Sequence, residues 1–261
     1  GNSMRVVIFL GPTLPIREAR DLIAAEILPP ARQGDIYRAV NAHHPDAIGL
    51  IDGVFHDAPA VWHREILWAL SLGVHVFGAA SMGALRAAEL APFGMCGVGQ
   101  IFEAYRNACW TGLDSRFEDD DEVAVIHAPP EAGSVPFSDA MVDLRATLAA
   151  AEMAGVISHE SALELAGAMK RRHFSERSLA ALAEAAGGIA GTWMAQHPQR
   201  IKRQDALAML NVMTGFLATH PAPFHPQFRF TPALVWQRFT KTVEREARQE
   251  TARALFEEFR P

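Results

Sequence analysis

The clearest signal in the sequence is residues 74–90, VHVFGAASMGALRAAEL. Its first four residues predict a buried strand, and its last seven predict the start of a helix. The small residues between them predict a tight turn that contains Ser81. Such a turn places a side chain at the carboxyl edge of a parallel sheet, beside free helix N–H groups that favour negative charge. The spacing Ala79–Gly83 resembles a G-x-S-x-G nucleophile elbow, which makes Ser81 the first candidate functional residue.

The first half of the chain alternates short apolar runs with helical patterns. The predicted strands are residues 6–10, 47–51, 74–77 and 123–126, with a shorter strand before Pro29, and the predicted helices are residues 16–25, 63–72, 84–90 and 100–109. This alternation predicts an α/β fold, a parallel open sheet with helices on both faces. Ligand sites in such sheets lie at the carboxyl ends of the strands. Those ends carry Gly11–Thr13, Asp52–Gly53 and Gly78–Gly83, with His127 as a further candidate.

The second half is rich in alanine and leucine at helical spacing. We expect an α/β core domain at residues 4–130, a Pro/Gly-rich linker at 127–136, and an α-helical C-terminal region at 138–261. Its predicted helices are residues 138–154, 158–174, 178–186, 205–217 and 231–259. Ser138 and Ser158 are predicted N-caps. The long charged last helix is expected either to pack across the body or to mediate a homodimer.

Composition narrows the class of protein. The chain is 49% hydrophobic and 21% charged, as in ordinary globular proteins, and no apolar run approaches a membrane span. Residues 1–4 resemble a tag remnant before a native Met, and the two cysteines make no disulfide scaffold, so we expect a cytoplasmic protein.

Charge is unevenly distributed along the chain. The net charge is −6, divided as −8 over residues 1–137 and +2 over residues 138–261. The small positive charge of residues 138–261 is less than a dedicated nucleic-acid binder would carry. The basic clusters at residues 170–172 and 200–203 are expected to be a solvated face, or else a docking surface for an acidic carrier protein.

Ser81 acting as a nucleophile would need a base and an orienting acid. The candidates are His63, which opens a predicted helix, and Asp52, which ends a predicted strand at the same edge; His56 and His75 are further possible bases, although His75 lies inside a predicted strand. The alternative is that Ser81 only caps the helix that begins at Met82, and one serine can do both.

Other motifs give weaker indications. His63-Arg64-Glu65 lacks the downstream P-C-x-x-C of zinc deaminases, so that class is excluded. The acidic run 118–122 is expected to be a solvated turn, or else an acid or weak Mg²⁺ contact at the site. The glycine-rich segment 94–99 matches no nucleotide-binding motif and predicts a tight turn, and Cys96 within it is an inert thiol or a persulfide carrier. We expect no metal and no cofactor.

Blocks of sequence spread over residues 4–130 resemble the TfuA-like family. The matching segments are Gly11–Leu14, Pro30–Asp35, Leu50–Phe55, Val61–Leu67, Gly78–Leu90, Gly94–Gly99 and Asp120–Ala124. One long block and several short ones occur in order, which makes the combined resemblance specific. The helical remainder resembles the family only loosely.

The resemblance implies a role in peptide backbone thioamidation, in ribosomally made peptide natural products or in methyl-coenzyme M reductase. A TfuA-like protein is understood to hydrolyse the thiocarboxylate of a ThiS-type ubiquitin-like sulfur carrier and to pass sulfide to a YcaO enzyme. From the composition we expect no nucleic-acid and no membrane partner. The alternatives are a non-catalytic adaptor that docks the YcaO enzyme and the carrier, and an unrelated serine hydrolase.

For this hydrolysis we predict a nucleophile, a base and its orienting acid, namely Ser81, His63 and Asp52. In a second version Ser81 only binds the carrier tail while His63 activates water. The N–H groups of Met82 and Gly83 would hold the oxyanion, and Arg86 would bind the thiocarboxylate. The remaining predicted substrate-binding residues are Gly11, Thr13, Gly53, Gly78 and Glu122.

Overall fold

The computed structural model describes residues 3–56, 58–113 and 115–260. Five parallel strands form an open sheet in the order β2-β1-β3-β4-β5. The strands are β1 (Val6–Phe9), β2 (Glu26–Leu28), β3 (Ala47–Leu50), β4 (His75–Ala79) and β5 (Cys96–Val98). The three central strands are almost entirely buried, as the continuous apolar runs of a sheet covered on both faces require.

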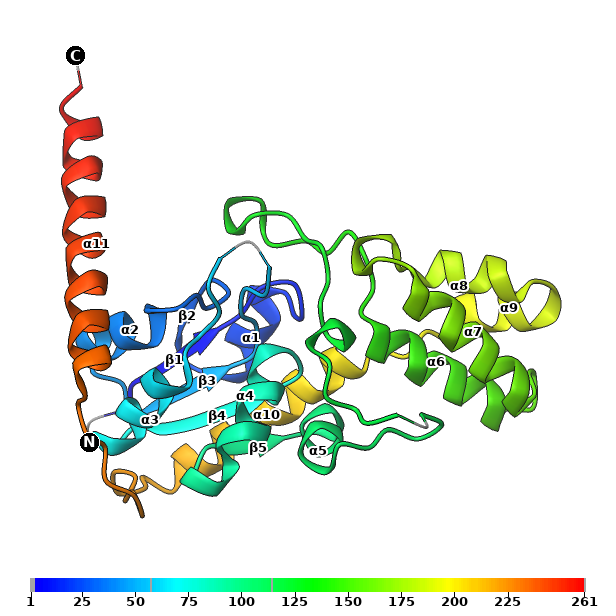
Figure 1. The fold of residues 1–261 in the computed structure, drawn as a ribbon, viewed down its shortest axis with the longest axis horizontal. Helices are drawn as coiled ribbons and strands as arrows, with labels where there is room; N and C mark the ends of the chain where they lie inside the picture. The colour runs from blue at the N-terminus through cyan, green and yellow to red at the C-terminus, as the bar shows by residue number, and fades with distance from the viewer. Residues whose placement is uncertain (1–2, 57, 114, 261) are drawn as a thin grey trace.

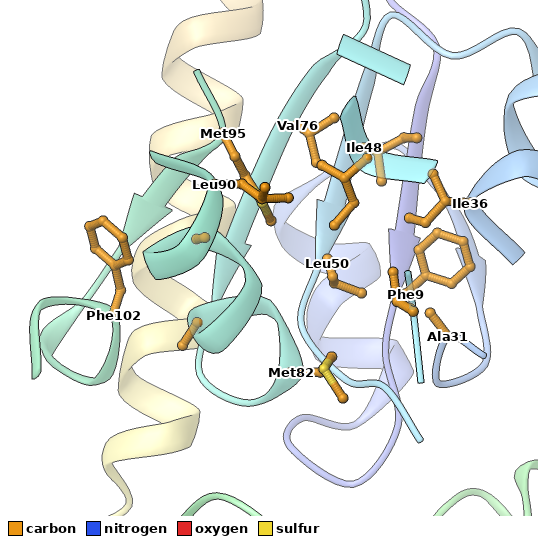
Figure 2. Close-up of a cluster of buried hydrophobic side chains, with 14 of the residues drawn as sticks. Phe9, Ala31, Ile36, Ile48, Leu50, Val76, Met82, Leu90, Met95 and Phe102 are labelled. Atoms are coloured by element: carbon orange, nitrogen blue, oxygen red, sulfur yellow. The ribbon is translucent and has the colours of Figure 1, made fainter. Parts of the chain in front are cut away.

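Helices cover both faces of the sheet, which confirms the predicted fold class. One face packs on α2 (Asp35–His43), α3 (His63–Ser71), α4 (Met82–Leu90) and α5 (Gln100–Asn107). Figure 2 shows part of this core, including Phe9, Leu50 and Met82. The other face packs on α1 (Ile16–Leu22) and α10 (Ile201–Ala218). A helix from late in the chain therefore completes the core of the first half, and Figure 1 shows α10 running from the helical region to the sheet.

The remaining helices form a lobe and a projecting arm. The lobe contains α6 (Met141–Met153), α7 (His159–Arg171), α8 (Leu179–Ala186) and α9 (Gly188–Gln196), around a core of its own. Helix α11 (Leu234–Glu258) buries Trp236 and Val243, but its far end projects from the body with Phe256 70% exposed (Figure 1). Among the described residues no helix combines the length and the apolar character that crossing a bilayer requires.

The predicted strand at residues 123–126 is wrong. The short 3-10 helix η2 (Asp120–Glu122) precedes an irregular segment there, which pairs with no strand of the sheet. Its backbone groups bond to side chains and to the Phe137 N–H, which donates to the Ile126 carbonyl. The Val123 carbonyl accepts a hydrogen bond from Lys202 Nζ, and the Ile126 N–H donates to Ser138 Oγ. Ser138 is therefore not the N-cap of α6, a position that Ala140 occupies.

Two further details concern local signals. Ser158 caps α7 as predicted, because its hydroxyl accepts a hydrogen bond from the Ser161 N–H. The glycine-rich segment expected to be only a turn contains the edge strand β5, which pairs with β4. Three further 3-10 turns, η1 (Ala91–Phe93), η3 (Pro130–Ala132) and η4 (Phe174–Glu176), connect the larger elements.

Candidate functional site

The strand order creates a crevice at the carboxyl edge of the sheet. Strand β1 has β2 on one side and β3 on the other, and the loops after β1 and β3 leave in opposite directions at such a reversal point. Because Leu50 is paired with Gly78, Asp52 and Ala80 lie at the same level just beyond the strands. The predicted neighbours Asp52 and Ser81 therefore meet at the edge where open α/β sheets bind ligands.

Ser81 lies in a strained turn between β4 and α4. Ala80 has a φ of 70°, a left-handed conformation that costs a residue with a side chain about 1–3 kcal/mol. The Ser81 N–H donates to the Ala79 carbonyl, and the Ser81 carbonyl accepts from the N–H of Ala84. Its hydroxyl caps nothing although Ser81 occupies the N-cap position, and the residue lines a cleft while being only 2% exposed. The geometry therefore favours ligand contact over simple capping.

Asp52 fixes the loop after β1. One carboxylate oxygen accepts hydrogen bonds from the N–H groups of Gly11 and Thr13, at 2.8 and 3.2 Å, and the other accepts from the Thr13 hydroxyl at 2.7 Å. Three donors thus occupy the buried carboxylate. Gly11 and Thr13 position Asp52, and a Cβ at Gly11 would meet Pro30 at 2.4 Å.

The cleft above this edge has a volume of about 1370 Å³. Its floor includes Asp52, Gly53 and Ser81. The loop before α2, residues 123–131 and the 173–175 connection of the helical lobe supply other walls. Because a small-molecule pocket measures about 300–1,000 Å³, this cleft has room for an extended peptide segment.

Lys202 is the site residue that sequence reasoning missed. It belongs to the 200–203 cluster that was expected to be solvated, yet it is only 5% exposed and lines the same cleft as Ser81 and Asp52. Its Nζ donates to the Val123 carbonyl at 2.7 Å, and its backbone N–H donates to Asp143. Burial lowers the pKa of Lys202, and the opposing charges of Asp52 and Asp143 do not reverse this direction. Only the packing of α10 on the sheet reveals this environment.

His63 and Arg86 lie in a different cluster. The His63 ring pairs with the Glu89 carboxylate, and Arg86 donates to Glu89 at 2.8 Å and to the Val61 carbonyl at 2.9 Å. Neither His63 nor Arg86 is among the described residues that line the cleft. The structure therefore brings Asp52 and Ser81 together and gives His63 another carboxylate partner.

The other histidines considered as bases are also placed. His75 begins β4 and its Nε2 lies 2.8 Å from the Ala222 carbonyl oxygen, far along the strand from Ser81. His56 lines the cleft but stacks on Phe174, with ring centroids 4.7 Å apart.

Partial burial raises the pKa of the Cys96 thiol, which argues against a stabilised thiolate there.

Three predicted substrate-binding residues near Ser81 have packing roles. A Cβ at Gly83 would lie 1.7 Å from the Leu50 carbonyl oxygen, and the Gly83 N–H already donates to the Ile51 carbonyl. A Cβ at Gly78 would lie 2.2 Å from the Gly83 carbonyl oxygen. The Met82 side chain is buried in the core (Figure 2), but its N–H makes no hydrogen bond to another described residue. Met82 is therefore the better of the two predicted oxyanion donors.

Glu122 is part of an ionic cluster, not of the cleft wall. This ionic cluster consists of Asp119, Asp121, Glu122, Arg145, Lys170 and Arg177. Arg145 makes a bidentate pair with Glu122, with both distances 3.0 Å, and both side chains are almost fully buried. The acidic run is therefore divided. Glu118, Asp119 and Asp120 are exposed, as expected of a solvated turn, whereas Glu122 is buried against the helical lobe. Asp121 pairs with Arg177 and also lines the cleft.

An open parallel sheet with a buried serine, aspartate and lysine around one cleft defines an α/β protein with its site at the carboxyl edge of the strands. Residues 52–178 match the family model described as TfuA-like protein. This match confirms the resemblance to the TfuA-like family that the sequence blocks indicate. The matched region contains Asp52 and Ser81 but ends before Lys202. A search of curated proteins found no match.

Proposed function

We propose that this protein hydrolyses the C-terminal thiocarboxylate of a ThiS-type sulfur carrier and supplies the released sulfide to a YcaO enzyme for peptide thioamidation. The match of residues 52–178 to the TfuA-like family model supports the substrate class. The observation that carries the proposal is the cleft at the sheet edge. There the Ser81 hydroxyl makes no hydrogen bond to another described residue, and the cleft volume exceeds that of small-molecule sites. An extended carrier tail would enter along this cleft and present its terminal carbon to Ser81.

The chemistry requires a nucleophile and a donor for the developing oxyanion. Ser81 Oγ attacks the thiocarboxyl carbon, the C–S bond breaks, and the serine proton leaves with sulfur as HS⁻. Water then cleaves the acyl-serine ester, which restores Ser81 and yields the carrier carboxylate and a proton. The Met82 N–H, at the positive end of α4, is the donor best placed for the oxyanion. The sum is one water consumed and one hydrogen sulfide formed.

The test is single-turnover sulfide release from thiocarboxylated carrier with no YcaO enzyme present. Ser81→Ala is expected to lower the rate by at least about 100-fold, because the nucleophile is lost. Ser175→Ala, which alters another cleft-lining serine, is the matched control and is expected to stay within about threefold of the wild type. Sulfide release by Ser81→Ala at the wild-type rate would show that Ser81 is not the nucleophile.

The same experiment separates the alternatives. A protein that releases no sulfide alone but accelerates a YcaO enzyme would be an adaptor, and the apolar projecting end of α11 favours such docking, with Phe256 and Phe259 70% and 79% exposed. Rapid hydrolysis of many simple esters would instead identify a general serine hydrolase.

A further inference from the structure

Helix α10 brings a lysine from the second half of the chain to the cleft that Ser81 lines. The helix runs antiparallel to the strands it covers: Phe216 packs on His75 and Phe77, and Met209 and Met213 lie over Gly49 in the middle of β3. Lys202 precedes Met209 by seven residues, which is about 10 Å along a helix. Asp52 follows Gly49 by three residues, which is also about 10 Å along a strand. Lys202 and Asp52 therefore reach the same level beyond the sheet.

Several contacts hold the lysine at this level. Asp205, one turn further along α10, accepts hydrogen bonds from the N–H groups of Gln100 and Ile101, which fixes α10 to the start of α5. Asp143 on α6 accepts from the backbone N–H of Lys202. Nζ has one backbone acceptor, the Val123 carbonyl, and among the described residues no carboxylate forms an ion pair with it. The amine is thus buried and positioned, yet no countercharge contacts it.

We propose that Lys202 Nζ is the proton acceptor for the Ser81 hydroxyl in this cleft. In the first step the hydroxyl proton passes to the neutral amine as Oγ bonds to the substrate carbon. The lysine then gives that proton to the departing sulfur, so that HS⁻ leaves and the amine is neutral again. In the second step the amine takes a proton from the attacking water and gives it to Ser81 Oγ as the acyl ester breaks. The inference rests on the proposed function for its substrate, but the reactivity of Ser81 tests it without that substrate.

Burial favours this role, and the nearby carboxylates do not reverse its effect. The low dielectric around Lys202 favours the neutral amine, which is the form a proton acceptor needs. The charged groups that face it are Asp52, at the end of β3, and Asp143, on α6, and both favour the protonated form. The Asp52 carboxylate already accepts three hydrogen bonds from the loop after β1. Its charge acts on the Lys202 amine, but the two groups form no direct ion pair. His63, the base predicted from the sequence, pairs with Glu89 instead.

The experiment measures labelling of Ser81 by a fluorophosphonate probe, with the labelled peptide identified by mass spectrometry. In the wild type the labelling rate is expected to rise with pH as Lys202 loses its proton. Lys202→Met is expected to label about 100-fold more slowly and without this pH dependence. Lys202→Arg is expected to be equally slow, since a guanidinium stays protonated. Arg203→Met, on the same turn but in an exposed pair with Glu18, is the control and should keep the wild-type rate.

Several results would overturn the inference. They are an unlabelled Ser81 in the wild type, a wild-type rate independent of pH, an unchanged rate and pH profile in Lys202→Met or Lys202→Arg, and loss of labelling in His63→Gln but not in Lys202→Met. The wild-type pH profile decides even if a lysine variant does not fold. Lysine-dependent labelling without sulfide release would leave the inference standing and contradict only the proposed substrate.

Discussion

Two lysines contact the same short segment of chain in opposite electrostatic settings. Lys170 on α7 lies 3.0–3.2 Å from carboxylate oxygens of Asp119, Asp121 and Glu122. Burial alone would favour its neutral form, but these carboxylates raise the pKa of Lys170. Lys202 on α10 contacts the neighbouring Val123 carbonyl, and burial lowers its pKa.

The comparison teaches that burial and the number of direct countercharges, not the residue type, set the pKa of a lysine. In the ionic cluster the charges are paired and tie the 119–122 segment to the helical lobe. In the cleft the lysine has no direct ion pair among the described residues, and so its proton can move. We therefore expect changes in the ionic cluster to affect stability and changes in the cleft to affect reactivity.

The largest expected effect is a loss of stability from a substitution at Gly83, where α4 packs on the sheet next to the cleft. Gly83→Ala would place a Cβ 1.7 Å from the Leu50 carbonyl oxygen. The atoms it would meet, in Leu50 and Gly78, are backbone atoms of strands and cannot easily move away. The free energy of unfolding should fall by about 4 kcal/mol, at or beyond the upper end of overpacking costs. Urea denaturation followed by circular dichroism measures it.

Gly215→Ala on α10 is the matched control for that variant. A Cβ there would meet no atom within 4 Å, so the helix should gain about 0.5–1 kcal/mol from the replacement of glycine. Equal stability of the Gly83 and Gly215 variants would mean that α4 does not pack this closely on β3.

The second expected effect breaks the ionic cluster. Arg145→Met removes both hydrogen bonds from buried Glu122 and leaves Lys170 as its remaining ion-pair partner. Stability should fall by about 3 kcal/mol, because a buried carboxylate loses its main countercharge. Arg116→Met removes an exposed pair with Glu118 and should change stability by less than about 1 kcal/mol. Ser81 labelling of folded Arg145→Met should equal the wild type, and a large loss of labelling would show that the two regions are not separate.

The smallest expected effect comes from removing the charge of Asp52, which tests how a nearby carboxylate changes the pKa of Lys202. Asp52→Asn should cost about 1–2 kcal/mol, because an amide cannot accept all the hydrogen bonds from Gly11 and Thr13. The charge of Asp52 raises the pKa of Lys202, so its removal should lower that pKa and move the labelling profile to lower pH. Asp46→Asn, which affects an exposed acceptor of the Arg5 N–H, should leave the profile in place. A shift to higher pH would contradict the assigned coupling.

Much of the fold follows from local patterns. The apolar runs at residues 6–10 and 47–51 predict β1 and β3, because strands buried on both faces need continuous apolar side chains. Strand β5 was missed because it is three residues long and contains Gly97, a composition typical of turns. The segment 123–126 has strand-like composition, but Lys202 and Ser138 satisfy backbone groups that a neighbouring strand would otherwise pair.

The candidate site also has residues that the sequence places correctly and residues that it does not. Turn chemistry places Ser81 and Asp52 at the sheet edge, since each lies two residues beyond the end of a strand. His63 was a reasonable partner by position, but its side chain pairs with Glu89 on α4, and sequence spacing does not show side-chain direction. Glu122 likewise pairs with Arg145, from a helix further along the chain.

By itself the sequence determined the parallel sheet, and the serine and aspartate at the carboxyl edge of its strands, because apolar runs and tight turns are local properties of the chain. Only the tertiary structure decided which helix covers the sheet and therefore that Lys202, in a basic cluster expected to be solvated, is buried beside the cleft. Burial and proton affinity depend on what surrounds a side chain in space, and those neighbours come from distant segments of the chain.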